Sequence, residues 1–81
     1  MPVILRYRGY RFFFFANEGD PREPIHVHVR SAERVAKFWV VPEVGLAESY
    51  RMTSSELNEL EEVVRENRNL IVETWNEFFP E

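Results

Sequence analysis

The sequence predicts an α+β domain in which an antiparallel sheet of four to five strands carries one or two C-terminal helices packed on one face. Apolar and polar residues alternate strictly over residues 23–30 (EPIHVHVR), which is the period of a half-buried strand. Turn-forming residues separate further short apolar runs across residues 1–51. Residues 53–56 (TSSE) then form a helix capping box. We therefore expect a single domain over residues 1–81, with the helical part at 52–81.

The composition excludes several classes of protein. A length of 81 residues is enough for one domain, and 44% hydrophobic with 15% aromatic residues is far from a disordered composition. No apolar run approaches the roughly 20 residues that cross a bilayer, so no membrane partner is expected. The absence of cysteine excludes disulfides and thiolate chemistry. Because the N-terminus lacks the basic and then apolar pattern of a secretory signal, we expect a cytoplasmic protein.

Charge is distributed unevenly along the chain, whose formal net charge is −4. Residues 1–51 carry eight Arg or Lys against six Asp or Glu, whereas residues 52–81 carry two against eight. The acidic side chains therefore gather on the helical part. This balance does not support nucleic acid as a general partner, although a local basic patch on the sheet remains compatible with it.

Residues 3–8 and 11–16 predict the first two strands, joined at a glycine by a tight turn. A two-residue turn at residues 9–10 places Arg8 opposite Arg11. Like charges in directly opposed positions lower stability, so a register shifted by one residue remains open.

Four consecutive phenylalanines, residues 12–15, make the second strand strongly apolar. They occupy both faces of the strand, since side chains alternate along it. Helices packed on one face cannot cover both. We therefore expect part of the cover to come from another chain, either a second copy in a homodimer or a different partner.

Residues 17–24 (NEGDPREP) predict a surface loop that leads into the strand of alternating residues. After a short turn at 31–34, residues 35–41 predict a fourth strand, and residues 44–50 predict a weaker fifth strand. Turns of even length fix which residues lie opposite one another, and directly opposed residues share a face. On one face they place His28, Lys37 and Glu48 in one row and His26, Trp39 and Leu46 in the next. The other face, toward the core, receives Val27, Val29, Ala36, Phe38, Val40 and Ala47.

The capping box begins a helix, because the Thr53 hydroxyl can accept from the Glu56 amide while the Glu56 carboxylate accepts from the Thr53 amide. The apolar stripe that follows is Leu57, Leu60, Val63, Val64, Leu70, Ile71, Trp75 and Phe78. Asparagines within residues 67–69 favour a break into two helices, although the same stripe also fits one long helix. We expect Trp75 to be buried against the core face of the sheet, with Phe78 also in the core.

The polar side of the central strand carries the most versatile side chains. Because residues two apart on a strand point the same way, His26, His28 and Arg30 share one face. Strand pairing adds Lys37 and Trp39 to that face. We predict that these five residues form a binding surface, with both histidines facing solvent.

His26 and His28 also have the spacing with which His-x-His pairs bind transition metals. A site needs a third ligand, and the nearby carboxylates are Asp20, Glu23 and Glu48, none of them fixed by its spacing. The simpler interpretation is that the histidines are the polar side of a half-buried strand. We therefore predict no metal and no cofactor.

Two histidines beside a lysine also suit acid–base cleavage of RNA. No nucleophile motif or glycine-rich phosphate loop accompanies them, so the sequence leaves open whether the protein is an enzyme. Trp39 with Arg30 and Lys37 offers instead an aromatic and cationic surface for a nucleic acid or a peptide. The alternative for Trp39 is packing under the loop of residues 17–24 or in a dimer interface.

Four segments of the chain resemble a known family. They are Arg-x-Phe-x-Phe at Arg11, Phe13 and Phe15, EPIHVHV at residues 23–29, AKFW at 36–39 and LIVETWNEFF at 70–79. Together they resemble the bacterial family called domain of unknown function 4160. Its members are small proteins, often encoded beside another small protein, so the resemblance implies a two-protein module of toxin-antitoxin or regulatory type. The partner would then be the product of the neighbouring gene, and no catalytic residue is implied.

Overall fold

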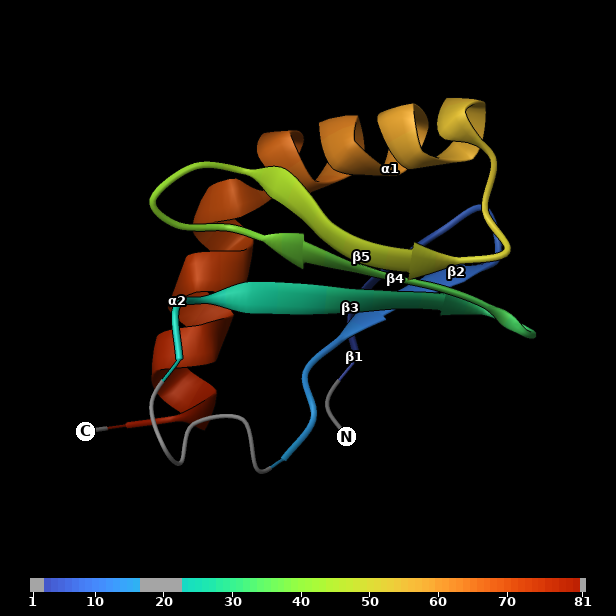
Figure 1. Ribbon diagram of the computed structural model, residues 1–81. Coiled ribbons are helices and arrows are strands. Elements are labelled where there is room, and N and C mark those ends of the chain that lie inside the picture. The colour runs from blue at the N-terminus through green and yellow to red at the C-terminus, as the bar shows by residue number, and fades with distance from the viewer. Residues whose placement is uncertain (1–2, 17–22, 81) are drawn as a thin grey trace.

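The computed structural model describes residues 3–16 and 23–80, which form a five-stranded antiparallel sheet followed by two helices (Figure 1). The elements are β1 (Val3–Tyr7), β2 (Tyr10–Phe13), β3 (His26–Ser31), β4 (Arg34–Trp39), β5 (Gly45–Tyr50), α1 (Ser54–Glu66) and α2 (Arg68–Phe78). The strands lie in the sheet in the order in which they occur in the chain. The predicted α+β fold is confirmed. The predicted loop of residues 17–24 falls mostly outside the described residues.

The first hairpin turns one residue earlier than predicted. Tyr7 lies opposite Tyr10, so the turn consists of residues 8–9, whose φ angles are 46° and 83°. Two successive positive φ angles match the twist of a tight hairpin, and the glycine adopts its angle without strain. The like-charge contact predicted for Arg11 persists, but its partner is Arg6 rather than the turn residue.

The predicted pairing of β3 with β4 is confirmed over its whole length. Between β4 and β5, Lys37 lies opposite Glu48 as predicted, but the register then shifts. One residue of β5 has no opposite neighbour there, as in a β-bulge. Trp39 therefore lies opposite Gly45, and its predicted pairing with Leu46 is wrong.

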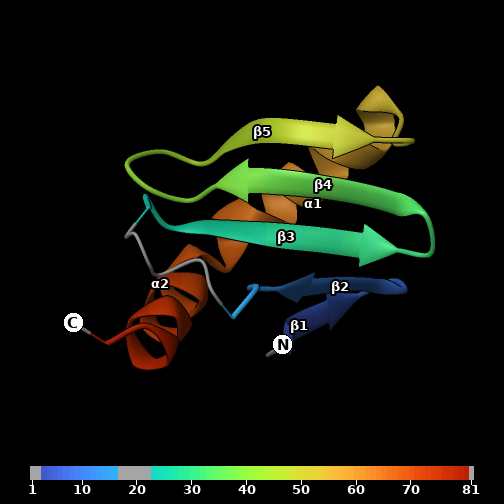
Figure 2. The ribbon, with the colours of Figure 1, turned by 60° about the horizontal axis from the view of Figure 1, so that its bottom comes forward.

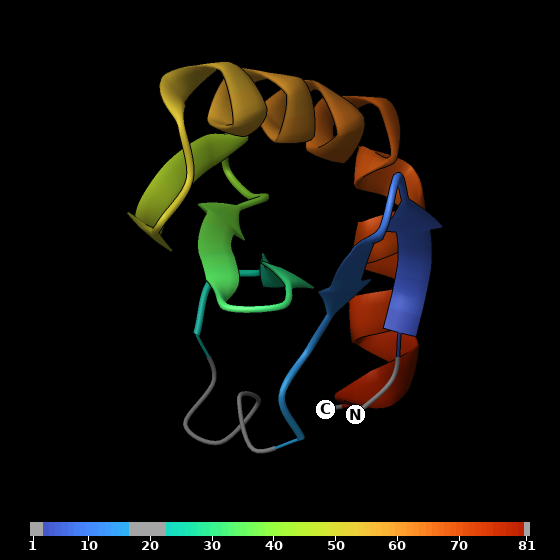
Figure 3. The ribbon, with the colours of Figure 1, turned by 90° about the vertical axis from the view of Figure 1, so that its right-hand side faces the viewer.

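The two helices are placed differently against the sheet. α1 lies across one face, whereas α2 turns away from α1 and passes the end of the sheet at which β3 begins (Figures 1 and 2). In Figure 3, α1 lies over one face of the sheet and α2 stands behind β1, so α1 leaves the opposite face of the sheet uncovered. We call this opposite face the outer face. One helix covers a face, and the other covers an end.

The core lies between the helices and the inner face of the sheet. Its buried members are Phe12, Phe14, Val27, Val29, Ala36, Phe38, Val40, Leu60, Val63, Val64, Ile71, Trp75 and Phe79. Trp75 is 0% exposed, which confirms its predicted burial, whereas Ala47 is only half-buried. Phe78, predicted for the core, is 38% exposed, and Phe79 is buried instead. Of the four consecutive phenylalanines only Phe15 is exposed. A single chain therefore already covers most of the apolar surface for which a second chain was expected.

The predicted helix start and helix break are both confirmed. The Glu56 amide donates to Thr53 Oγ1 at 3.1 Å, and the Thr53 amide donates to Glu56 Oε1 at 3.0 Å. Asn67 caps the C-terminal end of α1, and its side chain donates to the Val63 carbonyl at 2.8 Å. This asparagine therefore satisfies a carbonyl at the end of α1 and makes no side-chain cap for α2.

Candidate functional site on the outer face

The outer face is organised in three rows, because directly opposed residues of an antiparallel sheet point to the same side. The rows are Val3, Phe13, His28, Lys37 and Glu48; Arg6, Arg11, Arg30, Val35 and Tyr50; and His26, Trp39 and Gly45. The structure thus brings the five predicted binding residues onto one face. Their exposure, however, differs widely along it.

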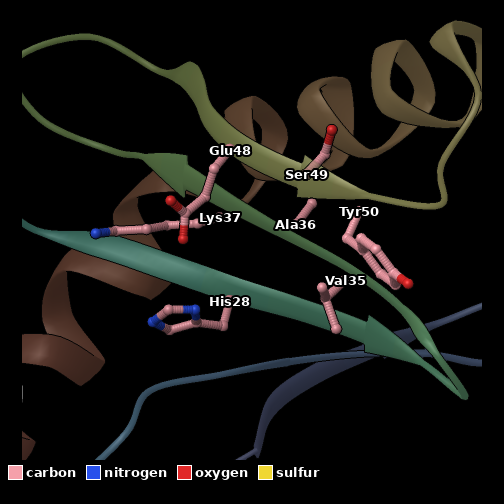
Figure 4. Close-up of a pocket in the computed structure, with 7 residues that line it drawn as sticks. All are labelled: His28, Val35, Ala36, Lys37, Glu48, Ser49 and Tyr50. Atoms are coloured by element: carbon pink, nitrogen blue, oxygen red, sulfur yellow. The ribbon is translucent and has the colours of Figure 1, made fainter.

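Three shallow hollows follow one another over this face. The first, about 260 Å³, lies over β3, β4 and β5 and is lined by His28, Lys37 and Glu48 among others (Figure 4). The second, about 210 Å³, shares His28 with the first and reaches Phe13 on β2. The third, about 200 Å³, shares Phe13 with the second and lies beside Arg11. Because neighbouring hollows share lining residues, the three adjoin one another across the strands, and we call them together the outer groove.

His28 lies at the centre of the outer groove and is half-buried. Its ring stacks on Phe13, with 5.7 Å between centroids, and meets Phe15 edge-on at 4.6 Å. Lys37 lies opposite it on β4. The imidazole is therefore held by aromatic rings on one side and borders the groove on another.

His26 does not face solvent as predicted, since it is 0% exposed. Its Nδ1 lies 2.9 Å from the Pro24 carbonyl oxygen, and because a carbonyl only accepts, Nδ1 carries the hydrogen of this bond. The ring also meets Trp39 and Trp75 edge-on, at centroid distances of 5.7 and 5.2 Å. It is buried because α2 passes this end of the sheet and places Trp75 against it. His26 is part of the packing, and His28 alone lines the groove.

Lys37 and Trp39 form the predicted aromatic and cationic pair. The Lys37 Nζ lies 4.6 Å from the centre of the Trp39 ring, a cation–π contact. Trp39 is half-buried and also lines a separate hollow of about 300 Å³ with Pro24 and Pro42. One face of the indole is thus occupied by the lysine of the same strand.

Two further arginines extend the predicted set, in which Arg30 was the one arginine. Arg6 on β1 lies opposite Arg11 on β2, which lies opposite Arg30 on β3, and all three are exposed. We call them the arginine row. Within residues 3–16 and 23–80, no carboxylate lies within ion-pair distance of any of them. The misplaced first turn concealed this row in the sequence, because it put Arg11 opposite the wrong residue.

Arginine is paired on the side of the sheet that faces α1. The Arg34 Nη1 lies 2.5 Å from Glu56 Oε2, which also accepts from the Tyr10 hydroxyl. The hydrogen bond from Tyr10, the amide of Thr53 and the charge of Arg34 lower the pKa of Glu56 to about 2. The same bond to Glu56 raises the pKa of Tyr10. This network fastens α1 to β2 and β4, while the arginine row has no comparable partner among the described residues.

The suggested metal ligands do not come together around the histidines. In the part of the chain that the structure describes, no three His, Asp or Glu side chains are placed to hold a metal ion. Of the suggested third ligands, Asp20 lies outside that part, and Glu23 and Glu48 do not complete a site. The outer face therefore presents cations, a half-buried imidazole and shallow hollows.

Comparison with known proteins places the chain in a family. No curated protein and no solved structure matches it. Neither described helix is long and apolar enough to span a membrane. A family sequence pattern matches residues 9–76, which include β2 to β5, α1 and most of α2. The chain therefore belongs to the family described as domain of unknown function (DUF4160).

Proposed function

We propose that this chain is the binding subunit of a bacterial two-protein module of toxin-antitoxin or regulatory type. Its partner in the cytoplasm is the small protein encoded by the neighbouring gene, and the outer groove is where the two proteins meet. Membership of the family supports the module, since its members often stand beside a second small protein gene. The outer face supports the place of contact.

The observation that carries the proposal is the shape of the outer groove. Each of its hollows holds about 200 to 260 Å³, which is below the usual size of a small-molecule pocket. Together they cross strands spaced about 4.8 Å apart, so they extend further across the sheet than one small-molecule pocket, as a contact surface for a macromolecule does. Exposed aromatic and cationic side chains, Tyr50 and Arg30 among them, border it, and both residue types are enriched at protein interfaces.

Two exposed apolar residues provide a matched test. Tyr50 is 55% exposed and lines the outer groove, whereas Leu70 is 44% exposed and lies on α2. The protein is co-expressed with the product of the neighbouring gene, and the affinity of the purified pair is measured by calorimetry. We expect Tyr50→Ala to weaken binding about fivefold or more, while Leu70→Ala changes it less than about twofold. Equal effects of the two substitutions would place the interface elsewhere.

A second copy of the chain is the other protein that could occupy this face. Phe15 and Tyr50 are both exposed on it, at 39% and 55%. Light scattering of the chain alone at micromolar concentration separates the cases, because a homodimer through the outer face would double the mass and Tyr50→Ala would restore the monomer. The proposed hetero-complex instead requires a monomer that gains mass only with its partner.

The competing proposal is a small acid–base enzyme acting on RNA, with or without a metal. One observation favours it: His28 and Lys37 lie opposite one another in a hollow. Since His26 is buried, this chemistry would depend on His28. Labelled RNA is incubated with the protein, with and without Zn²⁺ or Ni²⁺. Cleavage that disappears in His28→Gln would replace the binding proposal.

A further inference from the structure

We infer that the arginine row, Arg6, Arg11 and Arg30, binds the carboxylates of an acidic, extended segment of the partner protein. This inference rests on the proposed function and names the chemistry of what the outer face recognises. Three observations carry it: the spacing of the three arginine positions across the strands, the lack of a carboxylate partner for them within residues 3–16 and 23–80, and the apolar hollow beside them.

The arginine row has the spacing of a short peptide. Its three members lie at one level on three neighbouring strands, so their Cα atoms span about 10 Å, twice the interstrand distance. An extended chain rises about 3.3 Å per residue, so three or four residues cross the row. Each guanidinium group presents a planar fork of donors that fits a carboxylate. Two or three Asp or Glu residues within about five positions would therefore match the row.

The arginine row is electrostatically unfavourable in the free protein. Like charges in directly opposed positions of a sheet are destabilising. The chain has 14 carboxylates, and other arginines use them: Arg8 pairs with Glu59, Arg34 with Glu56, and Arg65 with Glu61. Arg30 Nε donates instead to the Ala32 carbonyl at 3.0 Å. A ligand with negative charge would remove the repulsion that the fold leaves in place.

The surroundings favour an acidic peptide over a nucleic acid. The hollow beside the row is lined by Val3 and Phe13, which suit an apolar side chain between two carboxylates. Bases need exposed rings on which to stack, but the ring in this hollow, Phe13, is only 6% exposed and lies against His28; the exposed rings of Phe15 and Tyr50 line the other two hollows. The net charge of −4 also opposes a long polyphosphate chain. A short acidic segment places its charges only beside the arginine row, so the remaining negative charge of the protein repels it less than it repels a long chain.

The test uses two matched double variants with the same change of charge. Arg11→Gln with Arg30→Gln removes two members of the arginine row, and Arg8→Gln with Arg65→Gln removes two exposed arginines elsewhere. Circular dichroism first establishes that both variants are folded. The probes are a fluorescein-labelled peptide in which Glu alternates with Val, the same peptide with Gln in place of Glu, and a single-stranded oligonucleotide of equal charge.

We expect the Glu peptide to bind the wild-type protein more tightly than the Gln peptide or the oligonucleotide, with an affinity that falls as salt is added. The double variant Arg11→Gln with Arg30→Gln should bind the Glu peptide about five- to tenfold more weakly than the wild type. The control variant, Arg8→Gln with Arg65→Gln, should bind it less than about twofold more weakly. Equal losses in both variants, no preference for Glu over Gln, or tighter binding of the oligonucleotide would overturn the inference. The purified partner separates it from the proposed function: a complex weakened by Tyr50→Ala but not by the arginine changes would keep the interface and reject the acidic segment.

Discussion

The outer face of β3 ends in two different ways. At one end His26 is buried among Pro24, Trp39 and Trp75, and at the other end Arg30 is exposed beside Arg11. Both residues belong to the same strand and point to the same side. The difference comes from α2, which passes only the end where β3 begins (Figure 2). The face to which a side chain points is therefore not enough to predict its burial.

The two ends are also held by different forces. The closed end, which we define as His26, Trp39 and Trp75 with Phe14, is a cluster of rings, with Phe14 and Trp75 edge-on at 5.0 Å. The open end, defined as the arginine row, consists of like charges exposed to water. Ring packing stabilises strongly and depends little on salt, whereas exposed charges act weakly and are screened. Substitutions at the two ends should therefore differ in size and even in sign.

The largest effect is expected from Trp75→Ala at the closed end. Trp75 is 0% exposed, and its loss should lower the free energy of unfolding by about 3–5 kcal/mol. Urea unfolding measures this. The control is Trp75→Phe, expected to lose less than about 2 kcal/mol, because it keeps a ring and removes a buried Nε1 hydrogen that has no acceptor among the described residues. If Trp75→Ala lost less than about 1 kcal/mol, the rings would not be what closes this end.

Substituting His26 and His28 one at a time compares a position at the closed end of β3 with a position in the outer groove, using a single residue type. His26→Gln should lower the free energy of unfolding by about 1–3 kcal/mol, since it disturbs a buried hydrogen bond to Pro24 and contacts with two tryptophans. His28→Gln, in a half-buried position, should lower it by less than about 1 kcal/mol. Urea unfolding of both variants under one condition decides. Equal losses would mean that the boundary between the closed and the open end lies beyond His28.

The sequence predicted what local chemistry determines. Alternation and even turns placed His28 beside Lys37, and the capping box placed the start of α1, because neighbouring residues alone decide both. The course of α2 depends on tertiary packing, so the burial of His26 was not predictable from its strand. Phe79 was missed because it follows the last residue of α2, where the helical period no longer applies.

The same distinction explains what was missed on the outer face. A bulge leaves a weaker signal in the sequence than a turn does. The bulge between β4 and β5 was therefore not predicted, and the predicted pairing of Leu46 with Trp39 was wrong. The arginine row depended on a turn in which Arg8 adopts a φ of 46°, an angle that non-glycine residues rarely take. A register that avoids the repulsion between Arg8 and Arg11 places Arg6 opposite Arg11 and so contains the same kind of repulsion. Propensity alone therefore could not have chosen between the registers.

A third prediction concerns the contact that holds α1 over the sheet. The pKa of Glu56 is lowered to about 2 in the folded protein from its ordinary value of 4.5. Its contribution to stability is therefore complete above pH 4.5 and is lost as the pH falls toward about 2. Urea unfolding across this range should show that Glu56→Gln is less stable than the wild type at neutral pH, with a difference that shrinks in acid. Glu62→Gln is the control: it keeps the Glu56 contacts and should retain the acid-dependent loss.

The smallest effect is expected at the open end, and it has the opposite sign. Arg11→Glu replaces two like-charge contacts, with Arg6 and Arg30, by two opposite-charge contacts, each worth about 0.2–1 kcal/mol across strands. The variant should therefore be slightly more stable than the wild type, with Arg11→Gln between the two, and high salt should reduce the gain. Urea unfolding at low and high salt measures both effects. A loss of stability in Arg11→Glu at either salt concentration would show instead that the arginine stem covers apolar surface at Phe13. We expect the same substitution to stabilise the fold and to abolish binding of the acidic peptide. That result would mean that the arginine row lowers the stability of the free protein and is kept because it binds a partner.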